Sequence, residues 1–308
     1  MGIRFRSKRK LGLAIGLVLA IGWAVVWALG PAAISLVAEE RPASLRVVAS
    51  IFPLKEFAQA VAGERAEVSL FLPPGAEIHN WQPTPRQIIN LRKADVFIYV
   101  GARLEPWADE VARSGGGTVP KLLEASRGLK LIGNDPHVWL DFELACAIVE
   151  KIRIVLSEAD PEGAGLFNKN AKAYTETLLA LDRKYRQSLA SCGTRILVIG
   201  GHAAFGYLAA RYGLTQVALY GLSPDSEPTP RHLIEVVRRI KEAKARAVFF
   251  EATVNPKLAR LLAEEADAQT LPLSDGVGLT ADELASQRSF LDIMEANLKS
   301  LIHGLGCR

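Results

Sequence analysis

The chain has 308 residues, of which 49% are hydrophobic and 23% are charged, enough for one large or two medium globular domains. This composition excludes a disordered or fibrous protein. The formal net charge is +4, but five basic residues precede the first acidic one, and the rest of the chain is nearly neutral. Because nucleic-acid binding depends on a basic face over the folded body, we expect no nucleic-acid partner.

An apolar segment follows this basic cluster at the N-terminus. Leu11 to Ala38 contains no charged residue, and a basic stretch followed by an apolar run is the arrangement of an export signal. An apolar run of roughly 20 residues can also span a bilayer as an uncleaved anchor. We therefore expect residues 1–43 to be either a signal peptide or an N-terminal membrane anchor. The remainder is expected to be periplasmic or otherwise extracytoplasmic, with membrane contact only if the segment stays uncleaved.

Strand-like and helix-like stretches then alternate in two series. The first series is 45–50, 54–62, 66–72, 85–93 and 96–100, where apolar β-branched runs and amphipathic stretches take turns. The second series is 196–199, 204–212, 215–219, 230–243, 247–250, 256–266 and 269–273. Between the two series, Gly163 to Ala190 has apolar residues at helical spacing and predicts one long helix.

Alternation of this kind predicts parallel sheets covered by helices. We expect an α/β fold with two lobes, each with a mainly parallel sheet flanked by helices, joined by one long helix. The expected boundaries are an N-terminal lobe over residues 44–158, a linking helix over 159–192 and a C-terminal lobe over 193–308.

The three cysteines belong to a chain destined for an oxidising compartment, where neighbouring thiols tend to pair. Cys146 falls on the apolar stripe of a helix-like stretch and is expected to be a buried, unpaired small hydrophobe. Cys192 and Cys307 are the candidates for a disulfide, although spacing alone does not show that they meet.

Three of the five histidines lie in loops that follow apolar runs, rather than inside helix-like stretches. They are His79, after residues 66–72, His137, after residues 129–132, and His202, after residues 196–199. Each of the three is expected to lie past the carboxyl end of a strand. Because ligands bind at the carboxyl edge of open parallel sheets, we expect these imidazoles to converge on a metal site in the cleft between the lobes.

Two carboxylates of the second lobe have the same placement. Asp275 follows the run 269–273, and Glu251 follows the run 247–250. Three imidazoles and the Asp275 carboxylate match the ligand chemistry of zinc, with manganese as the alternative. Glu251 is interpreted either as a partner that supports a ligand imidazole or as a member of a structural ion pair.

Several ordered motifs carry a resemblance to one family. They include Val48-Ala49-Ser50-Ile51-Phe52-Pro53, Gly75-Ala76-Glu77-Ile78-His79, Asp135-Pro136-His137-Val138-Trp139-Leu140-Asp141 and His202-Ala203-Ala204-Phe205-Gly206-Tyr207. From about Leu45 onward the chain resembles the metal-binding receptors of ABC transporters that import zinc and manganese, the cluster A-I or zinc-uptake solute-binding family. The resemblance implies His79, His137 and His202 as ligands and Asp275 as the fourth, within an Asp-Gly-Val-Gly loop where the family commonly has Asp-Pro-Leu-Gly.

The resemblance implies a solute-binding protein, not an enzyme, that captures a divalent transition-metal ion and delivers it to an ABC-type import permease. Histidine at position 202 favours zinc, because manganese-type receptors tend to have a carboxylate there. The absence of a histidine-rich loop between His79 and His137 keeps manganese open. We expect the receptor to be a monomer.

Two other functions stay open. A zinc-dependent hydrolase needs only three protein ligands and an open water position, with Glu251 as the candidate base. The chain has no His-Glu-x-x-His run, and a fourth protein ligand would close the site to water. A metal-binding adhesin would use the same fold with a structural metal, and a dedicated permease partner would distinguish transport from adhesion.

Overall fold

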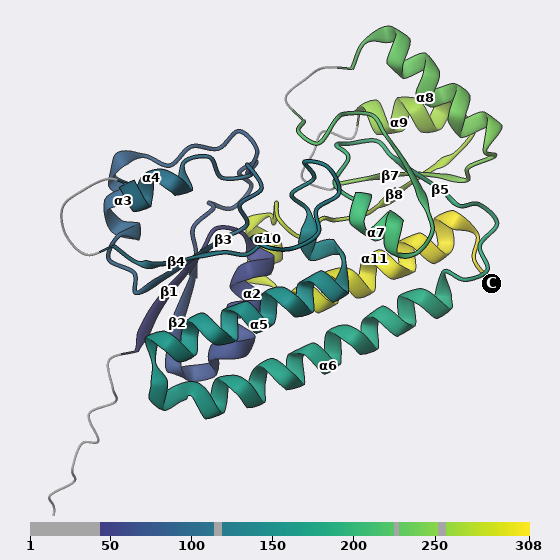
Figure 1. Cartoon of the computed structure of the whole chain (residues 1–308). Coiled ribbons are helices and arrows are strands. Elements are labelled where there is room, and N and C mark those ends of the chain that lie inside the picture. Colours follow the sequence, from purple (N-terminus) through teal and green to yellow (C-terminus); the bar gives the residue numbers. More distant parts are fainter. Residues whose placement is uncertain (1–43, 114–118, 225–227, 252–256) are drawn as a thin grey trace, which may run out of the picture. The chain divides into compact units, whose positions relative to one another are not determined.

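The parallel sheets expected from the sequence are present in the computed structural model, which describes residues 44–113, 119–224, 228–251 and 257–308 (Figure 1). The export segment predicted over residues 1–43 lies outside the described residues, as does Pro256 at the start of one expected helix. Within the described ranges, no helix is both long enough and apolar enough to cross a membrane.

The first lobe contains a four-stranded sheet in the order β2-β1-β3-β4 with every pairing parallel. Its strands are β1 (Leu45–Ala49), β2 (Ala66–Leu70), β3 (Val96–Tyr99) and β4 (Lys121–Glu124). Every residue of β3 is buried, because this central strand is covered on both faces. Val96 and Ile98 pack toward helices α2 (Phe52–Ala62) and α5 (Phe142–Ala159). Their neighbours in the strand face α3 (Pro85–Leu91) and α4 (Ala108–Arg113).

The second lobe repeats this topology with the order β6-β5-β7-β8, again fully parallel. Its strands are β5 (Ile196–Ile199), β6 (Thr215–Ala218), β7 (Ala247–Phe250) and β8 (Gln269–Pro272). One face packs against α8 (Pro230–Glu242) and α9 (Lys257–Glu265). The other face packs against α7 (Gly206–Arg211) and α11 (Phe290–Leu305), and the short helix α10 (Ala281–Ala285) precedes α11.

Each sheet has two central strands, β1 and β3 in the first lobe and β5 and β7 in the second. The strand that follows the first central strand lies on one side of this pair, and the strand that follows the second lies on the other side, so the strand order reverses between them. Such a reversal separates the loops at the carboxyl ends of the two strands and leaves room for a ligand. The shared strand order therefore gives each lobe a comparable edge at which functional loops can gather.

The long helix α6 (Ala164–Ser188) links the lobes and begins after a short 3-10 turn, Pro161–Gly163. At 25 residues it extends about 37 Å. It buries the apolar stripe predicted from the sequence against α2, α5 and α11, and in Figure 1 it runs along the base of both lobes. The Tyr185 hydroxyl donates a hydrogen bond of 2.6 Å to the Met294 carbonyl, which joins α6 to α11. Helix α11 contacts α2 of the first lobe as well as β7 and β8 of the second, so it connects the lobes beside α6.

A disulfide between Cys192 and Cys307 joins the end of α6 to the C-terminus, and Cys146 is a free, half-buried thiol. Because the bond closes a loop with a sequence separation of 115, it restricts the unfolded chain strongly.

The two-lobed α/β fold expected from the sequence is confirmed, but one local expectation is wrong. Residues 129–132 do not form a strand, and the strand before His137 is instead β4. Gly128 has a φ of +74°, which turns the chain, and Leu131 and Ile132 are 37% and 45% exposed. This apolar piece therefore lies on a surface turn and does not enter the sheet.

Candidate metal site

The three loop histidines of the sequence analysis lie together. His79 is in the loop after β2, His137 directly precedes the 3-10 turn Val138–Leu140, and His202 is in the loop after β5. The ring centroids are 5.3 Å apart for His79 and His137, 5.2 Å for His79 and His202, and 5.1 Å for His137 and His202. The three rings form a nearly equilateral triangle, with two corners from the first lobe and one from the second.

The Asp135 carboxylate fixes the His137 ring. Its Oδ1 accepts a hydrogen bond of 2.9 Å from the His137 backbone N–H and lies 2.7 Å from Nδ1 of the same residue. Both side chains are buried. A proton on Nδ1 is stabilised by the carboxylate, so the tautomer that fits this contact leaves a lone pair on Nε2.

Asp135 is itself held from the second lobe. The Tyr207 hydroxyl donates a hydrogen bond of 3.1 Å to the Asp135 carbonyl. A side chain at Gly206 would meet Asp135 Oδ2 at 2.6 Å, so the start of α7 approaches this carboxylate as closely as only glycine allows. The orientation of His137 therefore depends on how the two lobes meet.

A buried carboxylate also lies beside His202. Glu251 Oε1 is 3.2 Å from His202 Nδ1, an ion-pair distance without the hydrogen-bond geometry of the Asp135 contact, and both side chains are buried. Burial lowers the pKa of His202, but the Glu251 carboxylate, with smaller contributions from Asp275 and Glu77, outweighs burial and raises this pKa to about 9. Glu251 thus favours a proton on the His202 ring through its negative charge near Nδ1, and Nε2 lies on the other side of the ring.

The Nε2 atoms of His137 and His202 lie 3.2 Å apart. With a carboxylate near each Nδ1, both Nε2 atoms face the same space. In the metal-free protein a proton on one Nε2 can be shared with the other at this distance, and a cation that binds both nitrogens takes the place of that proton. The arrangement therefore has the chemistry of a cation site.

Asp275 approaches the histidines from the edge of the second sheet. One ligand atom each from His202, Glu251 and Asp275 lie within 4.8 Å of one another, as do those of the three histidines. Among the described residues, Asp275 is thus grouped with His202 and Glu251, whereas His79 and His137 belong to the group of the three histidines. Burial and the neighbouring Glu251 raise the pKa of the Asp275 carboxyl group, whereas His202 and His137 oppose this rise. The Trp139 indole N–H donates a hydrogen bond of 2.7 Å to the Asp275 carbonyl from the first lobe.

Sequence reasoning did not identify Asp135, Trp139 or Tyr207 as parts of this site. Asp135 and Trp139 each lie two residues from His137, so their closeness along the chain was the available signal. Tyr207 reaches its partner over 72 positions and from the other lobe. The remaining histidines, His232 and His303, lie on α8 and α11.

Comparison with known proteins places the chain among zinc receptors. The family model for the periplasmic zinc-uptake complex component A, ZnuA, matches residues 47–304. The high-affinity zinc uptake system protein ZnuA of Bacillus subtilis is 33% identical over 92% of this chain and 95% of its own length. The zinc-binding lipoprotein AdcA of Streptococcus pneumoniae serotype 4 is 34% identical over 83% of this chain. The chain spans only 55% of the length of that longer relative.

Solved structures agree with this relationship. The Zn(II)-bound ZnuA-like domain of Streptococcus pneumoniae AdcA is 35% identical, with a TM-score of 0.76 over 85% of this chain and 99% of that one. The laminin-binding protein Lmb of Streptococcus agalactiae, a bifunctional protein with adhesin and metal-transporting activity, is 30% identical, with a TM-score of 0.78 over 85% of this chain and 100% of that one. With the family model matching most of its length, the chain belongs to the ZnuA family of zinc-uptake receptors, which are metal-binding components of transporters.

Proposed function

We propose that this protein captures one zinc ion between its lobes, outside the cytoplasm, and delivers it to an ABC-type import permease. The observation that carries the proposal is the meeting of His137 and His202, from different lobes, with their Nε2 atoms 3.2 Å apart. Two nitrogens that bind the same tetrahedral zinc ion at its usual bond length lie about 3.3 Å apart. The two imidazoles thus have the spacing that a shared zinc ion requires.

His79, His137, His202 and Asp275 are the proposed ligands. Three neutral imidazoles and one carboxylate form a closed, four-coordinate zinc set. Asp135 supports the set by accepting the Nδ1 proton of His137, which increases the basicity of the ligand nitrogen, and Glu251 supports His202 through its negative charge at ion-pair distance from Nδ1. The Zn(II)-bound AdcA domain, 35% identical to this chain, supports zinc as the ligand.

Zinc is favoured over manganese by the same donors. Manganese prefers oxygen ligands, whereas imidazole suits zinc, and the proposed set contains three imidazoles. Manganese remains the alternative ligand, which a direct competition between the two metals distinguishes.

Binding from two lobes lets the ion stabilise their joined arrangement. A metal ion stabilises whichever conformation offers it all its ligands, by its difference in affinity for the two states. Three contacts between the lobes surround the ligands here: Trp139 with Asp275, Tyr207 with Asp135, and the Gly75 N–H with the Leu279 carbonyl at 3.0 Å. A permease that separates these contacts would deprive the ion of part of its ligand set and favour release.

A catalytic role is not part of this proposal. A hydrolase would need a coordination position for water beside the protein ligands, and the four proposed ligands fill a tetrahedral zinc site. Glu251, the carboxylate that could have served as a base, contacts His202 Nδ1 and is 5% exposed. The Lmb relative supports an adhesin as the second function, because that protein combines adhesion with metal transport in the same fold.

Zinc titration of the chelator-stripped protein and its Asp275→Ala variant tests the proposal. One zinc per chain is expected, with affinity weakened in the variant, whereas Glu264→Ala, which removes an exposed carboxylate on α9, should bind as the wild type does. Undiminished binding by Asp275→Ala would show that Asp275 is not the fourth ligand. A coordination position for water would then be available, and a hydrolase would again be a candidate function. Absence of zinc binding by the wild type would overturn the proposal.

A further inference from the structure

The loop that carries Asp275 leaves the second sheet at its outer strand. β8 is an edge strand, and the Leu273 N–H makes the final pairing with its neighbour, a bond of 2.9 Å to the Phe250 carbonyl. The next residue, Ser274, lies past the ladder. Gly276 has a φ of +83°, a conformation that favours glycine, and glycine gives a loop more conformational freedom than other residues. The direction of this loop must therefore be fixed by contacts outside the sheet.

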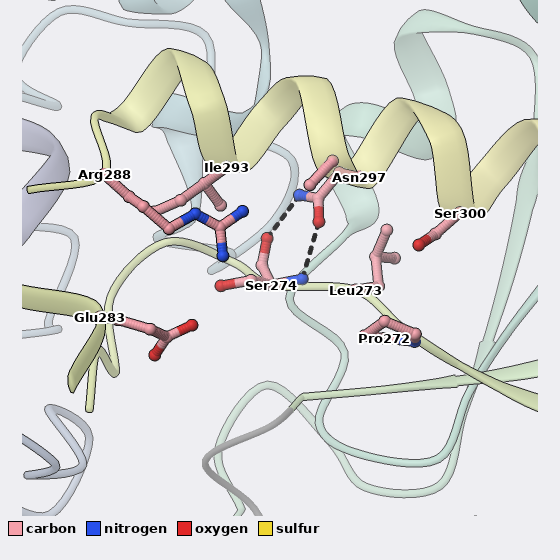
Figure 2. A pocket seen from close by; sticks show the side chains of 9 residues that line it. Pro272, Leu273, Ser274, Glu283, Arg288, Ile293, Asn297 and Ser300 are labelled. Atoms are coloured by element: carbon pink, nitrogen blue, oxygen red, sulfur yellow. Dashed lines mark hydrogen bonds between the residues drawn. The ribbon is translucent and has the colours of Figure 1, made fainter. Parts of the chain in front are cut away.

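Asn297 on α11 provides such a contact. Its Oδ1 accepts a hydrogen bond of 2.9 Å from the Ser274 N–H, and its Nδ2 donates one of 2.7 Å to the Ser274 carbonyl. Figure 2 shows both bonds, with the amide facing the Ser274 backbone squarely. This side chain pairs with the loop as a neighbouring strand would, and it is only 3% exposed.

We propose that Asn297 is the residue that positions Asp275 for metal binding, by extending the pairing of β8 one residue past the edge of the sheet. This inference rests on the proposed role of Asp275 as a ligand. A buried amide paired to both the N–H and the carbonyl of one residue sets the position and the direction of the backbone at that residue. The next residue along the chain is Asp275, so a displacement of the Ser274 backbone also displaces the Asp275 carboxylate.

The remaining contacts of the loop complete this arrangement. The Ser274 Oγ accepts a hydrogen bond of 3.1 Å from the Gly276 N–H, and Asp275 Oδ1 accepts one of 2.9 Å from the Val277 N–H. These two bonds shape the turn but do not attach it to the rest of the lobe. Asn297 attaches the turn to α11, whereas Trp139 attaches it to the first lobe, so among the hydrogen bonds of the described residues Asn297 holds the turn within the second lobe.

A cavity beside Asn297 makes the inference testable without loss of the fold. A space of about 120 Å³ is lined by Ser274, Glu283, Arg288, Asn297 and Ser300, among others, and is drawn in Figure 2. It has room for water to reach the Ser274 backbone if the amide is removed, and Glu283, Arg288 and Ser300 supply polar groups along its wall. Asn297→Ala should therefore leave a folded protein whose loop is less well placed.

The test is a double-mutant cycle on zinc affinity in the full chain, measured by competition with a chromophoric chelator. Asn297→Ala is expected to weaken zinc binding about 10-fold, the lower range for a residue that orients a ligand. In the Asp275→Ala background, the same change should have no further effect, because the residue acts only through Asp275. Ser300→Ala, in the same cavity wall, is the matched control and should bind zinc as the wild type does.

A structural role alone would give a different pattern. In that case Asn297→Ala would weaken binding equally with or without Asp275, and this result would overturn the inference. Asn297→Ala with unchanged affinity, beside a weakened Asp275→Ala, would also overturn it while leaving the proposed function intact. Wild-type affinity in Asp275→Ala itself would show that Asp275 is not a ligand, and the inference about Asn297 would then fail together with this part of the proposed function.

A spectroscopic readout gives independent evidence. With Co²⁺ in place of zinc, the visible spectrum reports the geometry of the ligand set. The spectrum of Asn297→Ala is expected to shift toward that of Asp275→Ala, and melting of the metal-free variants should show that both are folded. A cobalt spectrum identical to that of the wild type would contradict the positioning role.

Discussion

His137 and His202 come from different lobes and face each other through Nε2 atoms 3.2 Å apart, each with a buried carboxylate at its Nδ1. Neither lobe alone contains this pair. The site therefore depends on the joined lobes, and the residues that hold the rings matter along with the ligands.

Removal of one of these rings is expected to abolish tight zinc binding. His202→Ala removes one of the four proposed ligands, the proposed histidine ligand of the second lobe, so affinity should fall by at least about 100-fold. Calorimetric titration with zinc measures this directly. His232→Ala, which removes a histidine of α8, is the control and should retain wild-type affinity. Equal losses in both variants would argue against a specific role for His202.

The carboxylate behind His137 is expected to contribute through orientation and charge. Asp135→Asn keeps an oxygen that can accept the Nδ1 proton but loses the charge, so zinc affinity should fall about 10-fold. Asp135→Ala also loses the acceptor and should fall further, toward about 100-fold. The exposed Asp267, changed to Asn, provides the matched control. The order of the two Asp135 variants, measured by chelator competition, is the decisive result: an equal loss in both would mean that the acceptor oxygen has no role.

The buried Glu105 carboxyl group is expected to make the free energy of unfolding depend on pH, independently of metal binding. This buried carboxyl accepts hydrogen bonds from the Ser50 hydroxyl and from the Val100 and Gly101 N–H groups, yet burial raises its pKa from 4.5 to about 7. The folded state thus holds the proton more tightly than the unfolded state. Stability from this group is fully present below pH 4.5 and is lost as the pH rises through about 7.

Glu105→Gln isolates this contribution. The free energy of unfolding of the wild type should decline relative to the variant by about 3 kcal/mol between acidic and mildly alkaline pH. Urea unfolding of the metal-free proteins at a series of pH values measures the difference. A constant difference across the range would show that the Glu105 carboxyl group titrates as it does in the unfolded chain.

The disulfide is expected to be a major source of stability. Because Cys192 and Cys307 are 115 positions apart, reduction should lower the free energy of unfolding by about 4 kcal/mol. Cys192→Ser should give the same loss without reductant, whereas Cys146→Ser, at the free half-buried thiol, should cost far less. Thiol titration of the unfolded, unreduced protein should find a single free thiol. Three free thiols would contradict the bond.

Sequence periodicity was sufficient for most of the fold because the buried strands are short β-branched runs. It did not reveal β4, where Lys121-Leu122-Leu123-Glu124 has only two apolar residues. β4 is an edge strand, so it needs less apolar surface than β3, and its sequence signal is weaker.

The histidines of the site were predictable, but the contacts that orient them were not. Placement after strands indicates which edge of a sheet a loop occupies, and this was enough for His79, His137 and His202 to be expected together. The Tyr207 contact to Asp135 depends on how two lobes meet, and local pattern contains no information about this. Glu251 was interpreted either as a partner of a ligand imidazole or as a member of an ion pair. Both descriptions apply to the same contact, because Glu251 is at ion-pair distance from the proposed ligand His202.

Metal analysis after competition tests the central claim most directly. The purified, chelator-stripped protein is equilibrated with equal zinc and manganese, separated from free metal and analysed for both. One zinc per chain with little manganese is the predicted result. A chain that holds no metal, or that prefers manganese, would contradict the account.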